Sequence, residues 1–282
     1  MKRARTRLGL ILVLGMLTAG LPISAIAPAV AAPGEVVAYD MVGSGSQNLT
    51  SFTDDPAIPF TSAGDGFNKF QRGVSSTIPF AVLDDSLSIF PGDSLGIIKE
   101  GNTDEFFGIV DTNNGDTGGS DVVATWVFDV SGAANLNLSI DAGAMGDFEA
   151  SNDSFNWSYS IDGSAAQTVF ASSVDEAVAN TYVLDGGASV TLNDPILMNG
   201  TILTNDLATF TAPLTGTGSQ LTLILTANGD GGSEAVAFQN LIIEGTAGPS
   251  VVAYDMVGSG SQNLTSFTDD PAIPFTSAGD GF

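Results

Sequence analysis

Hydrophobic and polar residues alternate along much of this chain with a period of two rather than the 3.6 residues of a helix. The alternation is clearest over residues 135–142 (NLNLSIDA), 155–162 (FNWSYSID) and 220–227 (QLTLILTA). Successive side chains of a β-strand point to opposite faces of a sheet. These segments therefore predict strands with one buried face and one solvent-exposed face.

Other segments are more continuously apolar and rich in β-branched and aromatic residues, as core strands are. They are residues 122–130 (VVATWVFDV), 208–214 (ATFTAPL) and 235–244 (AVAFQNLIIE). Clusters of Gly, Asn, Asp and Ser separate the apolar runs and are typical of turns, as in residues 113–121 (NNGDTGGSD) and 228–234 (NGDGGSE).

The pattern as a whole predicts an all-β fold, a two-sheet β-sandwich of the jelly-roll type with about a dozen strands. We expect at most one short helix, over residues 172–180 (SSVDEAVAN). The aromatic residues fall mostly on alternating strand positions beside aliphatic ones, so we expect them to pack in the core rather than to form a sugar-stacking surface.

The first 31 residues have the order of a secretory signal peptide. Four basic residues within Lys2–Arg7 precede the apolar run Leu8–Leu21, and Ala29-Val30-Ala31 forms a small-residue cleavage site. No later segment is long and apolar enough to span a bilayer. We expect cleavage after Ala31, no membrane insertion of the mature chain, and a secreted or cell-surface location.

A long segment occurs twice, because residues 251–282 repeat residues 36–67 without a difference. The offset is the size of one domain. We interpret residues 32–245 as one module, 246–250 as a linker, and 251–282 as the truncated start of a second identical module. Two explanations remain open. The chain is a fragment of a longer tandem array, or the second copy pairs into a neighbouring molecule by strand exchange and gives self-association.

The charge balance excludes several partners. Removal of the signal peptide leaves Lys69, Arg72 and Lys99 against 32 acidic residues, so nucleic acid is not an expected partner. The whole chain has no His and no Cys, which excludes Ser-His-Asp triads, cysteine nucleophiles, thiolate zinc sites and disulfides. Divalent cations that prefer oxygen ligands, Ca²⁺ above all, are the natural partners of such a chain.

Three acidic clusters are candidate calcium sites, because carboxylates this close repel unless an ion or hydrogen bonds compensate them. Solvated turns are the alternative for each, and catalysis by a carboxylate pair such as Glu149 and Glu234 is a third interpretation. The candidate metal ligands are Asp111, Asn113 and Asp116 in the first cluster, Asp147, Glu149 and Asp153 in the second, and Asp230 and Glu234 in the third.

Residues 122–244 carry a resemblance to a known group of modules. The motifs are Asp129–Gly132 (DVSG), the acidic turn 147–153, Tyr159–Gly163 (YSIDG) and residues 230–241, where Gln239 replaces the usual Asp. In these the chain resembles β-sandwich modules of large secreted bacterial proteins, including those beside extracellular endonuclease domains of the ExeM/NucH type. The nuclease's catalytic motifs are absent, so the resemblance implies a module and not the activity.

These observations together predict a secreted, non-catalytic β-sandwich module, stabilised by Ca²⁺, that acts as a repeated adhesive or ligand-binding unit of a longer extracellular or cell-surface protein. Its expected partners are divalent cations, with glycans or other surface proteins as further candidates. One alternative is a carbohydrate-binding accessory module of an exported hydrolase. The other is a strand-exchanging fibre subunit.

Overall fold

The computed structural model describes residues 34–55, 57–58, 65–75, 77–87, 94–114, 121–247, 254–257 and 260–262. All of them belong to the unit Gly34–Phe282. The predicted signal peptide lies outside the described residues. The described residues form strands and one short 3₁₀ turn, η1 (Phe80–Val82), which confirms the all-β prediction. None of them forms a helix of the length and apolarity that a membrane span requires.

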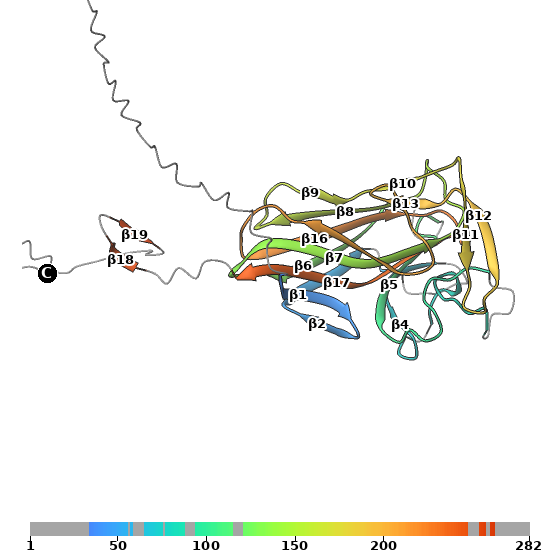
Figure 1. Ribbon diagram of the computed structural model, residues 1–282, viewed down its shortest axis with the longest axis horizontal. Helices are drawn as coiled ribbons and strands as arrows, with labels where there is room; N and C mark the ends of the chain where they lie inside the picture. The colour runs from blue at the N-terminus through green and yellow to red at the C-terminus, as the bar shows by residue number, and fades with distance from the viewer. Residues whose placement is uncertain are drawn as a thin grey trace, which may run out of the picture. The chain divides into compact units, whose positions relative to one another are not determined.

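Two large sheets make up the sandwich (Figure 1). The first consists of β1 (Glu35–Val42), β2 (Gly45–Gln47), β4 (Gly66–Gln71), β5 (Glu105–Val110), β7 (Ala133–Met145), β15 (Ala208–Pro213) and β17 (Ala235–Ala247). The second consists of β3 (Leu49–Asp55), β6 (Val122–Asp129), β8 (Ser154–Ile161), β9 (Gln167–Phe170) and β16 (Gln220–Asn228).

The strand order is that of a jelly roll. The chain alternates between the sheets along β6, β7 and β8, and again along β15, β16 and β17. Antiparallel pairing gives the order β5-β17-β7-β15 in one sheet and β6-β16-β8-β9 in the other, the two interleaved four-strand sets of this fold. The predicted jelly-roll sandwich is therefore confirmed.

Strand β17 has two partners along one edge. Its first half pairs with β5, from Val236 to Phe238, and its second half pairs with β1, from Leu241 to Gly245. A register shift follows Gln239, where Asn240 adopts a φ of +51°. Such a bulge bends a strand. As a result β1 and β5 meet along this edge, where the Glu105 N–H donates to the Gly43 carbonyl at 2.7 Å.

An aromatic cluster fills the space between the sheets. Trp126 and Trp157 of the second sheet stack with ring centroids 5.4 Å apart, and Phe238 of the first sheet meets Trp157 edge-on at 4.9 Å. All three side chains are fully buried. The large aromatic residues of these strands thus form the core, as the alternation predicts, and offer no exposed ring for stacking.

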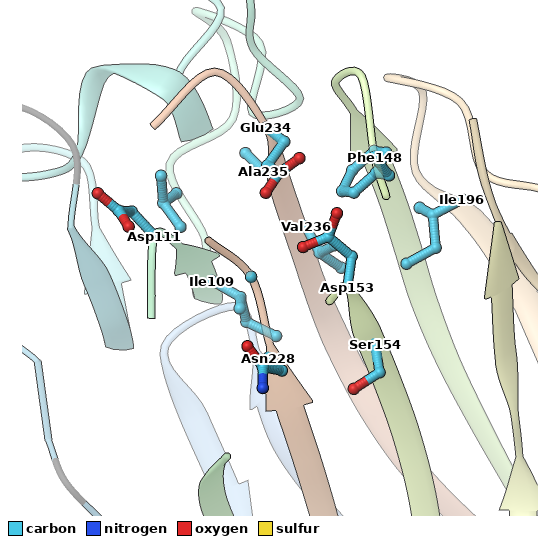
Figure 2. A pocket seen from close by; sticks show the side chains of 12 residues that line it. Ile109, Asp111, Phe148, Asp153, Ser154, Ile196, Asn228, Glu234, Ala235 and Val236 are labelled. Atoms are coloured by element: carbon cyan, nitrogen blue, oxygen red, sulfur yellow. The ribbon is translucent and has the colours of Figure 1, made fainter. Parts of the chain in front are cut away.

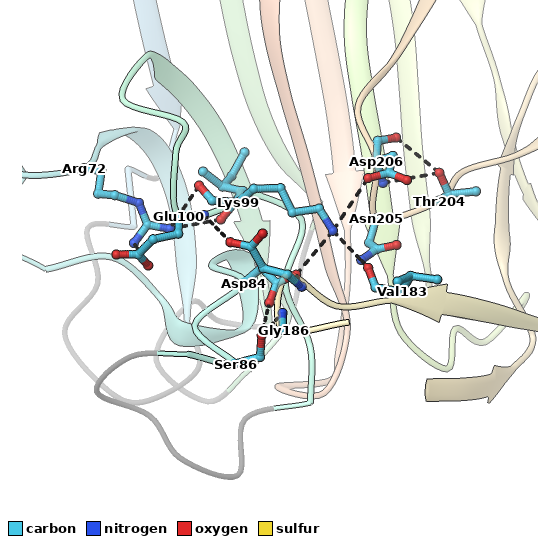
Figure 3. A network of polar contacts seen from close by, with 12 residues as sticks. Arg72, Asp84, Ser86, Lys99, Glu100, Val183, Gly186, Thr204, Asn205 and Asp206 are labelled. Carbon is cyan, nitrogen blue, oxygen red and sulfur yellow. Dashed lines mark hydrogen bonds and ion pairs between the residues drawn. The ribbon is translucent and has the colours of Figure 1, made fainter. Parts of the chain in front are cut away.

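Smaller strands extend one end of the sandwich. They are β10 (Ser172–Val174), β13 (Ile196–Met198) and β14 (Thr201–Ile202) in one sheet and β11 (Ala179–Val183) with β12 (Ser189–Asn193) in a hairpin. A polar network ties this hairpin to the loop after η1 (Figure 3). The Lys99 ammonium contacts Asp84 at 3.3 Å and donates to the Val183 carbonyl at 3.0 Å, while Asp84 accepts the N–H of Asp185 at 2.7 Å.

This network gives a stability prediction. Asp84→Ala should lower the free energy of unfolding by about 2–3 kcal/mol, because it removes the acceptor of the Asp185 N–H and the buried carboxylate that pairs with the Lys99 ammonium. The matched control is Asp206→Ala, which removes a carboxylate 79% exposed and 3.6 Å from the same ammonium. It should cost less than about 1 kcal/mol. Equal costs in urea unfolding would show that the network adds nothing beyond surface charge.

No helix forms over residues 172–180, which agrees with the expectation of at most one short helix. Ser172–Val174 pairs with Ile196–Met198 as strand β10, and β11 begins at Ala179. Between them Asp175 accepts the N–H of Ala177 at 3.1 Å, so its side chain forms a turn. The β-strand pairing partners lie about twenty residues further on, and tertiary contacts override a weak local helix propensity.

The repeated segment is described only in part. Strands β18 (Tyr254–Val257) and β19 (Gly260–Gln262) form a hairpin with the register of β1 and β2, since Tyr254 pairs with Gln262 as Tyr39 pairs with Gln47. The same sequence therefore adopts the same local hairpin in both places.

Candidate metal centre

Two connections of the jelly roll meet at one end of the sandwich. One joins β7 to β8 and carries residues 146–153, and the other joins β16 to β17 and carries residues 229–234. Both cross between the sheets beside each other, because Ser154 pairs with Asn228 in one sheet and Met145 with Ala235 in the other. The second and third acidic clusters of the sequence thus face each other across this end.

Four carboxylates converge there. Glu149, Asp153, Asp230 and Glu234 each place one oxygen so that all four atoms lie within 4.8 Å of one another. Asp153 and Glu234 are buried, with 7% and 3% of their surface exposed, whereas Glu149 and Asp230 face solvent. This group could hold a metal ion with one side shielded by the protein and the other open to water.

Donors from the same loops orient three of these carboxylates. Asp153 Oδ2 accepts the N–H of Glu149 at 2.5 Å, and Glu234 Oε1 accepts the N–H of Gly231 at 2.8 Å. Asp230 Oδ2 accepts the side-chain amide of Asn152 at 2.6 Å. Each contact leaves the other carboxylate oxygen for a further partner.

A small cavity lies beside the two buried carboxylates (Figure 2). Its volume is about 20 Å³, room for a single water molecule or ion. Figure 2 shows the side chains of Asp153 and Glu234 facing each other. Asp153 Oδ1 and Asn228 Oδ1, both from residues that line the cavity, are buried and have no hydrogen-bond partner within the described part of the chain. An acceptor buried in this way is costly unless a proton or a cation meets it.

The electrostatics show what the site lacks. Burial and then the charge of Asp153 raise the pKa of Glu234 to about 9. Burial also raises the pKa of Asp153, and the pKa of Glu149 rises through burial and the charge of Asp153. Without a cation, a proton on Glu234 relieves the repulsion. A divalent cation would replace that proton and restore the carboxylate.

A glycine permits the close packing of the two loops. A Cβ at Gly146 would lie 2.4 Å from Glu234 Cβ and 2.6 Å from Glu234 Cα, closer than atoms can approach. The absence of a side chain at this position lets the β7–β8 connection pass directly over Glu234 and hold it against Asp153.

The structure separates the eight predicted ligands into several groups. Glu149, Asp153, Asp230 and Glu234 come together as described. Asp111 follows the last residue of β5 and lines the cavity. Its pKa is raised mainly by burial and next by the charge of Asp65. These five residues remain candidates as ligands or neighbours of an ion.

The other predicted ligands take different positions. Asp147 is exposed and outside the group of four, and its charge contributes, after burial, to the raised pKa of Asp194. Asn113 supports the site through its backbone, because its N–H donates to the Gly229 carbonyl at 2.8 Å. Asp116 lies outside the described residues. The sequence did not predict that Asn228 and Asn152 contribute to this site. The signal that could have identified them is an amide side chain close to an acidic residue, two positions before Asp230 and one position before Asp153.

The arrangement favours ion binding over carboxylate catalysis. Pockets for small molecules have volumes of roughly 300–1,000 Å³, and the cavity beside Glu234 has room for about one water molecule.

Comparisons with known proteins do not name a family. No protein-family model matches the chain, and no curated protein is significantly similar to it in sequence. Eleven chains of solved structures match. One is the Clostridium thermocellum endo-1,4-β-D-xylanase 10B, as its CBM22-1 and GH10 modules complexed with xylohexaose, at 9% identity and a TM-score of 0.21. The match covers 50% of this chain and 24% of that one, and at this TM-score it carries no argument about function.

Proposed function

We propose that this chain is an exported, non-catalytic β-sandwich module that binds one structural Ca²⁺ and serves as an adhesive or ligand-binding unit of an extracellular or cell-surface protein. The observation that supports it most strongly is the buried Asp153 Oδ1, which accepts no hydrogen bond from an N–H or hydroxyl group of the described residues and lies beside Glu234 and an ion-sized cavity. A divalent cation would give this oxygen and its three neighbouring carboxylates a common partner.

The donor chemistry supports calcium among divalent cations. All four side chains offer carboxylate oxygens, and Asn228 adds an amide oxygen at the cavity. Ca²⁺ accepts six to eight oxygens in an adaptable shell, whereas Mg²⁺ demands near-ideal octahedral geometry and retains water. Zinc and copper favour imidazole or thiolate ligands, and the chain has neither His nor Cys.

The position of the site supports a structural role for the ion. It joins the β7–β8 connection to the β16–β17 connection, two of the crossings between the sheets at this end. A domain exported without cysteines cannot use disulfides to hold such crossings. The predicted signal peptide and the repeated segment of residues 251–282 support extracellular use.

Isothermal titration calorimetry of the mature chain tests this function. We expect one Ca²⁺ per chain, and binding too weak to measure in Asp153→Asn and Glu234→Gln, because each removes one of the two buried charges. The matched control is Asp147→Asn, which removes an exposed carboxylate of the same loop that is outside the group of four. No heat of binding in the wild type, or equal losses in the control, would contradict the site.

The alternative of a carbohydrate-binding accessory module stays a prediction, and a glycan array tests it. The buried positions of Trp126, Trp157 and Tyr159 leave these rings unavailable for stacking on a sugar. The strand-exchanging fibre also stays a prediction.

A further inference from the structure

The side chain of Lys69 enters the space between the two sheets. On β4 it pairs with Phe107 of β5, whose ring packs against Trp126 at 5.6 Å. The Lys69 ammonium lies 4.2 Å from the centroid of the Phe52 ring, and the side chain is 16% exposed. A cation in this position is largely removed from water.

The same ammonium contacts a buried carboxyl group. Lys69 Nζ lies 2.5 Å from Asp40 Oδ2, closer than the roughly 2.7–2.9 Å of most ammonium–carboxylate hydrogen bonds. Asp40 is 2% exposed, and its Oδ2 also accepts the indole N–H of Trp126 at 2.8 Å. An amine and a carboxyl group are thus held together in a mainly aromatic environment.

The meeting of β1 and β5 on the edge of β17 brings a second acid to this pair. Glu105, the first residue of β5, lies two positions before Phe107 and therefore on the same face of the sheet. Its N–H donates to the Gly43 carbonyl, which follows β1 directly. Burial raises the pKa of Glu105. The charge of Lys69 lowers this pKa by less, and the charge of Asp40 raises it further. Glu105 is thus suited to exchange protons beside Lys69 and Asp40.

We propose that Lys69 and Asp40 condense to an amide bond that links β4 to β1, with Glu105 as the residue that moves the protons. The reaction starts with transfer of one proton from the Lys69 ammonium to Oδ1 of the Asp40 carboxylate, which gives a neutral amine and a neutral acid. Lys69 Nζ then attacks Asp40 Cγ, and the Trp126 N–H stabilises the negative charge that develops on Oδ2.

The remaining steps balance without any co-reactant. Glu105 gives its proton to Oδ1, which leaves as water when the Cγ–Oδ1 bond breaks. The Glu105 carboxylate then takes a proton from Nζ and returns to its starting form. One C–N bond forms, one C–O bond breaks, and one water molecule is released. The product is a covalent loop of residues 40–69 in a chain that has no cysteine for a disulfide.

Asp54 of β3 is another carboxyl group whose charge interacts with Lys69. Burial raises the pKa of Asp54, while a backbone hydrogen bond and the charge of Lys69 lower it by less. Its Oδ2 is buried and has no hydrogen-bond partner within the described residues, whereas the Asp40 carboxyl contacts Nζ directly. The bond should therefore form at Asp40.

Mass spectrometry of the folded mature chain tests the proposal. The intact mass should be lower than the sequence mass by one water molecule. Lys69, Arg72 and Lys99 are the basic residues of the mature chain, so trypsin should fail to cut after Lys69 and leave one peptide that ends at Arg72 and contains the closed loop of residues 40–69. Fragment ions should place the link at Asp40. A full sequence mass, or a link at Asp54, would overturn the proposal.

Variants separate this chemistry from a structural role of the ion pair. Lys69→Arg keeps the charge and cannot form the amide, so it should have the full mass and a lower melting temperature. Glu105→Gln should fold and have the full sequence mass, because the variant lacks the residue that moves the protons and the bond does not form. Lys99→Arg is the matched control at another lysine that contacts a buried aspartate, and it should still lose water. Water loss that persists in Lys69→Arg would refute the link. Calcium titration of these variants should match the wild type, so this result is independent of the proposed metal site.

Discussion

Calcium at a hundredfold excess over its dissociation constant is expected to raise the free energy of unfolding of the mature chain by about 2.7 kcal/mol, and a chelator should reverse the gain. The reason is that the four carboxylates converge only in the folded chain, where β7–β8 and β16–β17 lie side by side. A ligand that binds the folded state alone stabilises it by mass action.

Thermal unfolding with and without calcium measures this gain. The double variant Asp153→Asn, Glu234→Gln should unfold at the same temperature in both conditions. It should also be more stable than the metal-free wild type, because it removes the cost of burying the Asp153 charge and of holding a proton on Glu234 above its ordinary pKa. Asp147→Asn should retain the full response. A calcium response that survives in the double variant would place the stabilising ion elsewhere.

The metal-free chain should lose stability as the pH rises between 4.5 and 9. Over this range folded Glu234 keeps a proton, since burial and the charge of Asp153 raise its pKa from 4.5 to about 9, whereas the unfolded chain has released it. The folded state therefore binds more protons, and a higher pH favours unfolding. The slope should approach about 1.4 kcal/mol per pH unit for this group.

Urea unfolding at several pH values in chelator tests this dependence. Glu234→Gln should flatten the slope, and saturating calcium should do the same in the wild type. A hydrogen bond with the Ser131 side chain lowers the pKa of Asp129, and a hydrogen bond with the Gln220 backbone lowers that of Asp162. These two groups make stability rise with pH, and they do so only at acid pH. Stability that is constant or rises from pH 5 to 8 without metal would contradict the assigned protonation of Glu234.

The sequence was most informative where the residue pattern repeats along a strand. The alternation in residues 135–142, 155–162 and 220–227 predicts β7, β8 and β16, and all three occur. Short strands such as β13 and β14 carry too few residues for any periodicity. The segment 172–180 has neutral propensities, so only its pairing with residues 196–198 could decide its structure.

The candidate site was predictable in its members and not in its assembly. Glu149, Asp153, Asp230 and Glu234 could be selected as acidic residues beside glycine-rich turns. Their convergence depends on which strands pair, and a jelly roll brings together two connections about eighty residues apart in the sequence. Spacing alone could not separate Glu149 from Asp147. The contact between Lys69 and Asp40 likewise follows from the bulge in β17 and has no local signature.

A crystal structure of the mature chain grown with calcium, with anomalous data collected to locate the ion, shows directly whether the four carboxylates bind it. We expect one anomalous peak among Glu149, Asp153, Asp230 and Glu234, with ligand oxygens at about 2.3–2.6 Å. A water molecule or a protonated carboxyl pair at this position, with calcium absent or bound elsewhere, would contradict it.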